Sequence, residues 1–127
     1  MITKVIIASS VTKIGNNAFS GCKKLKSVTL SNKLTAIGDK AFYKCIALTK
    51  ITIPSKVNKI GKSAFAGCKK LKTITIITKK LTSKNVRKNA FKRIHSKATI
   101  KVPKSKFKVY KSMLKKKGIG AKVKIKK

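Results

Sequence analysis

The sequence predicts a repeat solenoid of the α/β type, in which each coil contributes one short parallel strand. One stretch recurs three times: IGNNAFSGCKKLKSVTL from residue 14, IGDKAFYKCIALTKITI from 37 and IGKSAFAGCKKLKTITI from 60. Two sets of apolar positions share this constant step of 23: Phe19, Phe42 and Phe65, and Cys22, Cys45 and Cys68. A fixed period in the range of about 20–50 residues is typical of solenoids, because each repeat buries its face only against its neighbours.

Six short strands are expected, beginning near residues 4, 27, 50, 73, 99 and 122. The segments SVTL, KITI and TITI alternate polar and apolar residues, which is the period of a half-buried strand. The step from Phe65 to Phe91 is longer than the others, so three residues are inserted near 77–85. The N-terminal segment matches most of a coil, and we therefore include it in the stack.

The segments between strands predict turns. Gly15, Gly38 and Gly61 each follow an inward isoleucine, and we expect them to adopt unusual backbone angles. The GxxAFxxC stretch is too short for a stable free helix, so a single helical turn is expected on the convex side, with Asp39 near its N-terminus. Pro54 and Pro103 each follow a strand, where they are expected to cost no ladder hydrogen bond.

The C-terminal segment predicts a cap. KSKFKVYKSMLKKK, residues 104–117, has the pattern of an amphipathic helix with Phe107, Tyr110 and Leu114 on one face, and Gly118 follows as a stop. This helix and the last strand are expected to close one end of the stack, as solenoids require. The predicted organisation is one domain, with repeats over 1–103 and the cap over 104–127.

Composition points to an anionic partner. The chain of 127 residues has 33 Lys and two Arg against one acid, Asp39, and its formal net charge is +34. A hydrophobic fraction of 42% is too high for a disordered polycation. Lysine is a flexible, hydrated point charge, so its excess over arginine predicts non-specific attraction with steep salt dependence. No apolar run reaches the ~18 residues of a membrane span, and the apolar start is too short for a secretory signal.

Neither a metal site nor catalysis is expected. Three cysteines at equivalent positions of stacked coils form a line rather than converging on one ion, so a buried column of reduced thiols is predicted. His95 is the only histidine and is expected at the surface. General acid–base chemistry usually draws on His, Asp or Glu, and the chain holds two such residues. We therefore expect no enzyme activity and no cofactor.

A family resemblance is carried by the repeat itself. ITIPSKVNKIGKSAFAGCKKLKTITI, residues 51–76, and the two coils before it resemble the BspA-like leucine-rich repeats of bacterial surface proteins. KVPKSKFKVYKSMLKKKG is similar to the C-terminal end of many such proteins. The resemblance implies a leucine-rich-repeat stack, a secreted or cell-surface location and a role in adhesion or protein binding. A cytoplasmic location is the alternative.

The predicted geometry also gives a candidate binding face. Strands about 4.8 Å apart place equivalent outward residues in columns across a concave sheet. The face is rich in hydroxyls in the middle and basic toward the C-terminus, which suits sugars or phosphates. Its candidate residues are Lys4, Ser27, Thr29, Lys50, Thr52, Thr73, Thr75, Thr99, Lys101, Lys122 and Lys124.

Three functions are compatible with these observations. The first is a non-enzymatic binding or adhesion module of a surface or secreted protein, with a basic face for acidic proteins or for anionic polymers such as teichoic acid or acidic glycans. The second is non-specific nucleic-acid binding through phosphates. The third is a purely structural end-segment of a longer repeat protein.

Overall fold

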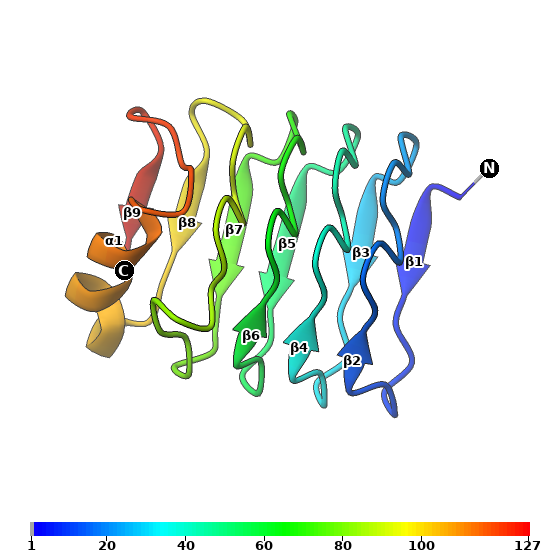
Figure 1. Ribbon diagram of the computed structural model, residues 1–127, viewed down its shortest axis with the longest axis horizontal. Coiled ribbons are helices and arrows are strands. Elements are labelled where there is room, and N and C mark those ends of the chain that lie inside the picture. Colours follow the sequence, from blue (N-terminus) through cyan, green and yellow to red (C-terminus); the bar gives the residue numbers. More distant parts are fainter. Residues whose placement is uncertain (1) are drawn as a thin grey trace.

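The computed structural model describes residues 2–127, which wind into coils stacked along one axis with the N-terminus at one end and a helix at the other (Figure 1). Every strand pair is parallel, as the predicted solenoid requires. The strands are β1 (Lys4–Ile6), β2 (Lys13–Ile14), β3 (Ser27–Thr29), β4 (Ala36–Ile37), β5 (Lys50–Ile53), β6 (Lys59–Ile60), β7 (Thr73–Ile76), β8 (Thr99–Lys101) and β9 (Lys124–Lys126).

Two faces of the stack carry these strands. The longer strands β1, β3, β5, β7, β8 and β9 follow one another along one face, and we call their outward-facing side chains the strand face (Figure 1). The shorter strands β2, β4 and β6 form a second sheet. The predicted starts of the first five longer strands, at residues 4, 27, 50, 73 and 99, are confirmed.

The predicted position of the last strand is wrong by two residues. β9 begins at Lys124 rather than near residue 122, and it pairs Lys124 with Thr99 and Lys126 with Lys101. The N–H of Val123 donates to the Gly120 carbonyl at 3.2 Å, so Lys122 lies in a turn before the strand. A shift of two residues preserves the alternation of a strand, and Ile125 therefore lies opposite Ile100 on the inner side.

The convex side contains turns in place of the expected helical turns. In the first coil, alternate N–H groups donate to the next coil: Asn17 to Asp39, Phe19 to Ala41 and Gly21 to Tyr43, at 2.7–2.9 Å. The intervening N–H groups close local turns, such as Ala18 to Gly15 at 3.3 Å. These inter-coil bonds use the donors that a helix would direct along its own axis. Several sites of positive φ fall in these turns, including Asn17 at 61° and Gly21 at 74°.

The glycine column has a different role from the predicted one, because Gly15, Gly38 and Gly61 do not adopt positive φ. A Cβ on Gly61 would lie 2.5 Å from the Asp39 nitrogen and from the Gly38 carbonyl carbon, so the two coils approach too closely for any side chain. Next to this column, the Asp39 carboxylate accepts the N–H of Lys62 at 2.9 Å. Asp39 thus links two coils and does not cap a helix.

The core consists of columns of like residues. The rings of Phe19, Phe42, Phe65 and Phe91 stack at centroid distances of 5.3–5.5 Å. The Cys45 thiol donates to the Phe19 carbonyl at 3.1 Å and the Cys68 thiol to the Phe42 carbonyl at 3.0 Å. Cys22, Cys45 and Cys68 are all free thiols, and Cys22 is the only one of them that is partly exposed. Contact with the Cys45 thiol and burial both raise the pKa of Cys68.

The cap consists of a short 3₁₀ helix, Lys104–Lys106, followed by α1 (Phe107–Leu114) and β9. Tyr110, Met113 and Leu114 of α1 are buried, and Phe107 is half-buried, so Met113 belongs to the apolar face as well. The Tyr110 hydroxyl donates to the Thr78 carbonyl at 2.8 Å and accepts the N–H of Leu81 at 3.1 Å. Among the described residues, no helix is both long and apolar enough to cross a membrane.

Candidate functional site

The structure places ten of the eleven candidate residues on the strands of one face. Two of them lie on each of β3, β5, β7 and β8, and one lies on each of β1 and β9. Lys122 is the exception, since it lies in the turn before β9. Lys124 takes the place opposite Thr99 that was expected for Lys122, and Lys126 lies opposite Lys101. Thr75, Ser27 and Thr99 are half-buried, whereas the other candidates are exposed.

This strand face is interrupted between β3 and β5. β1 pairs with β3, and β5, β7, β8 and β9 form a separate four-stranded sheet. Coils two and three nevertheless remain bonded elsewhere, through β4 and β6 and through the N–H of Phe42, which donates to the Ala64 carbonyl at 2.8 Å. We call the interruption the seam.

Pro54 lies directly after β5, next to the seam. One coil later, the N–H of Ile77 donates to the Ile53 carbonyl at 2.9 Å. Proline has no N–H, so Pro54 cannot donate the equivalent bond to Leu30. Pro103 stands at the same place after β8, where the ladder with β7 still forms, so the loss of one donor does not by itself open the sheet.

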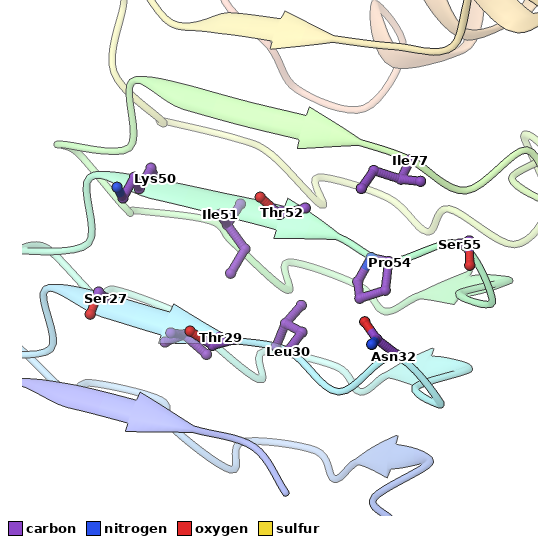
Figure 2. Close-up of a pocket in the computed structure, with 11 residues that line it drawn as sticks. Ser27, Thr29, Leu30, Asn32, Lys50, Ile51, Thr52, Pro54, Ser55 and Ile77 are labelled. Carbon is purple, nitrogen blue, oxygen red and sulfur yellow. The ribbon is translucent and has the colours of Figure 1, made fainter. Parts of the chain in front are cut away.

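A groove of about 620 Å³ lies along the seam (Figure 2). Its wall combines hydroxyls, an amide, apolar side chains and a single lysine. The lining residues are Ser27, Val28, Thr29, Leu30, Asn32, Lys50, Ile51, Thr52, Pro54, Ser55 and Ile77. Ile77 is 50% exposed, so it leaves apolar surface open to a partner at this groove.

Four candidate residues are brought together in this groove: Ser27, Thr29, Lys50 and Thr52. Sequence reasoning missed Asn32, Ser55 and Ile77, which follow the strands rather than belonging to them. Asn32 and Ser55 occupy equivalent positions of successive repeats, which is visible in the sequence. The alternation of polar and apolar residues, however, identifies outward-facing positions only within strands. The chemistry of this site is hydrogen bonding by hydroxyl and amide groups beside an apolar surface.

His95 and Asp39 each accept a hydrogen bond from a backbone N–H. Among residues 2–127, no three His, Cys, Asp or Glu side chains come close enough to hold a metal ion. His95 is half-buried, and its Nδ1 accepts the N–H of Lys97 at 3.0 Å. The Asp39 carboxylate is engaged with the backbone of Lys62.

Comparison with known proteins gives the family. The model of the BspA type leucine rich repeat region matches residues 1–119 with six copies. A leucine rich cell surface protein from Faecalibacterium prausnitzii is 43% identical over 60% of the chain, with a TM-score of 0.58. A leucine-rich repeat protein from Bacteroides ovatus is 28% identical over 97%, with a TM-score of 0.77. The T. pallidum leucine rich repeat protein is 30% identical over 80%, with a TM-score of 0.69.

The chain is shorter than these proteins, and it spans 20%, 29% and 46% of their respective chains. No curated protein matches it. The six matched repeats cover most of the sequence and coincide with the stacked coils of the structure. The chain belongs to the BspA-type leucine-rich repeat family.

Proposed function

We propose that the chain is a non-enzymatic binding or adhesion module of a bacterial surface or secreted protein. Membership of the leucine-rich repeat family supports a binding role. The similarity to a leucine rich cell surface protein of Faecalibacterium prausnitzii supports the location. The engagement of the Asp39 carboxylate with the N–H of Lys62 supports the absence of catalysis.

The observation that carries this proposal is the groove at the seam. Its hydroxyl and amide groups can orient a polar backbone, while the exposed Ile77 offers an apolar surface for a side chain. Such a mixture of an apolar wall with a few polar groups is typical of binding sites. Lys50 is its only charged residue, so the groove suits a peptide segment of a partner protein better than a highly charged polymer.

The excess of lysine supports a second property of the same module, attraction to anionic polymers such as teichoic acid or acidic glycans. Toward the C-terminus the strand face changes from threonine to lysine, at Lys101, Lys124 and Lys126. Polymers of negative charge bind such surfaces by counterion release, and their affinity falls as salt increases. In this proposal the candidate residues of the strand face therefore divide into a polar part and a basic part.

The groove is tested by selecting twelve-residue peptides from a display library against the immobilised chain at 0.5 M NaCl, where non-specific charge attraction is screened. We expect the affinity of selected peptides to fall about tenfold in Thr29→Lys/Thr52→Lys, because both side chains line the groove. Thr3→Lys/Thr12→Lys is the matched control, since both threonines are exposed and lie outside the groove. Equal loss in both variants, or no selectable peptide, would contradict the proposal.

A further inference from the structure

We propose that anionic polymers bind in a lysine-lined groove at the C-terminal cap, and that the preferred ligand is a linear glycan carrying sulfate or phosphate groups. This inference rests on the proposed function, because it assigns a site to the anionic partner predicted there. It concerns a surface formed by β8, α1 and β9, which the stack carries at the end opposite to the N-terminus (Figure 1).

Three neighbouring hollows at this end share lining residues, and we call them together the cap groove. One hollow of about 480 Å³ lies along α1 and shares Lys111 and Lys115 with a second hollow of about 610 Å³. The second shares Thr99, Ala121, Val123 and Lys124 with a third hollow of about 580 Å³. The lining residues are Lys97, Thr99, Phe107, Lys108, Lys111, Ser112, Lys115, Lys116, Ala121, Lys122, Val123, Lys124, Ile125 and Lys126.

The cap groove differs sharply from the seam in charge. Eight lysines line the cap groove, whereas one lysine lines the groove at the seam. The chain shows the same gradient: residues 104–127 contain 11 lysines, and residues 1–22 contain two. The only acid, Asp39, lies in the second coil and is absent from the cap. Positive charge in the cap groove is therefore concentrated and not neutralised by a carboxylate.

The arrangement of β8, α1 and β9 brings these lysines together. Thr99 lies on β8, Lys111 lies on α1, and Lys124 and Lys126 lie on β9. Lys115 follows directly after α1 as its C-terminal cap residue. The parallel pairing of β9 with β8 brings Lys124 opposite Thr99. The lysines of the cap groove thus converge from several elements, and a chain-like ligand crossing the groove would meet ammonium groups from each of them in succession.

The surrounding side chains favour a glycan over a nucleic acid. Base stacking needs a free aromatic face. The Phe107 ring already lies near the Nζ atoms of Lys111 and Lys127, each 5.4 Å from its centroid, and Tyr110 is buried. The remaining walls offer the Thr99 and Ser112 hydroxyls and half-buried Val123 and Ile125, which suit the hydroxyls and apolar faces of sugar rings. Lysine supplies point charges for sulfate or phosphate without the bidentate geometry of arginine.

The two grooves are separated along the stack, since the seam lies between β3 and β5 and the cap groove lies at β8, α1 and β9 (Figure 1). A polymer held at the cap leaves the seam uncovered. The chain can then hold an anionic matrix at one end while its seam engages a protein partner.

The experiment measures the affinity of labelled heparin, as the glycan probe, between 0.05 and 0.5 M NaCl. The test variant is Lys111→Gln/Lys115→Gln/Lys124→Gln/Lys126→Gln. The matched control is Lys23→Gln/Lys24→Gln/Lys69→Gln/Lys70→Gln, which removes the same charge from exposed positions outside the cap groove. We expect the affinity for heparin to fall about tenfold or more in the test variant and less than about threefold in the control. The slope of log affinity against log salt concentration should decrease in magnitude by about 3 in the test variant alone.

Each of the other outcomes contradicts one part of the proposal. Wild-type chain that does not bind heparin, teichoic acid or polyphosphate overturns the anionic-polymer part of the proposed function. Wild-type binding with equal losses in the two variants leaves that part standing and overturns the cap groove. Tighter binding of poly-dT than of heparin at matched charge overturns the glycan in favour of nucleic acid. Comparing dextran sulfate with dextran phosphate at matched charge distinguishes sulfate from phosphate on one backbone, and thermal unfolding of both variants verifies that they fold.

Discussion

At the scale of single residues, glycine sets how closely two coils can approach. In the glycine column, an added Cβ would meet the backbone of the preceding coil at Gly61 but would meet nothing within 4 Å at Gly15. The difference arises because Gly15 lies in the first described coil, and no other described coil packs against its outer side. The same residue in the same repeat position is therefore required for packing in one coil and not in the other.

This difference gives a prediction with an internal control. Gly61→Ala should lower the free energy of unfolding by about 1–3 kcal/mol, because the Asp39 nitrogen at 2.5 Å is backbone and cannot rotate away. Gly15→Ala should change stability little or raise it slightly, since alanine restricts the unfolded chain. Urea unfolding followed by circular dichroism measures both. Equal effects of the two substitutions would show that backbone conformation, and not the close approach of two coils, explains why glycine recurs at these positions.

At the scale of elements, one buried hydroxyl links α1 to the repeats, in addition to the pairing of β9 with β8. Tyr110 of α1 bonds to Thr78 and Leu81, which lie in the segment between β7 and β8. Thr73 of β7 pairs with Thr99 of β8, whereas Lys50 of β5 pairs with Thr73 of β7. The chain that connects β7 to β8 is therefore longer than the chain that connects β5 to β7. The additional residues thus place a loop where the helix can reach it.

Removal of this hydroxyl should weaken the cap. Tyr110→Phe leaves the Leu81 N–H and the Thr78 carbonyl without their partner, and we expect a loss of about 1–3 kcal/mol in the free energy of unfolding. Tyr43→Phe is the control, because the Tyr43 hydroxyl has no hydrogen-bond partner among residues 2–127 and its ring is only half-buried. Hydrogen exchange should show faster opening of α1 and of residues 78–81 in Tyr110→Phe alone. Unchanged protection in α1 would contradict this role.

The sequence predicted the repeated elements well and their exceptions poorly. The alternation and the constant repeat length were sufficient to place β1, β3, β5 and β7, because apolar spacing decides which residues face the core. The start of β9 was misplaced, since a slip of two residues keeps the same alternation and only the turn at Gly120 selects the register. Local patterns cannot distinguish two registers that bury equivalent side chains.

The candidate site was predicted in part for a related reason. Thr29 and Thr52 were found because outward strand positions follow directly from the alternation. The seam was not predicted, since SVTL, KITI and TITI alternate in the same way, although β5 forms a ladder with β7 and not with β3. The cap groove was missed because its lysines come from several elements, and their convergence depends on how α1 packs against β9. Pairing and packing between coils are not encoded in the pattern of any one coil.

At the scale of the whole molecule, charge opposes the fold that the apolar columns stabilise. Positive residues number 35 against one acid, and 23 of them lie in residues 64–127. Among the described residues Asp39 offers no ion pair to offset this repulsion, since its carboxylate contacts a backbone N–H. Buried columns of phenylalanine, leucine and isoleucine must therefore stabilise the stack against the mutual repulsion of its positive charges.

Salt should consequently stabilise the chain. The Debye length falls from about 30 Å at 0.01 M to about 10 Å at 0.1 M, so screening reaches the spacing between neighbouring lysines within this range. If repulsion weakens by about 2 kcal/mol, Tm rises by roughly 8 °C between 0.01 and 0.3 M NaCl. The variant with four cap lysines replaced by glutamine should show a smaller rise, because it begins with less charge. Scanning calorimetry measures both, and a Tm that is independent of salt would show that the lysines are too far apart to oppose folding.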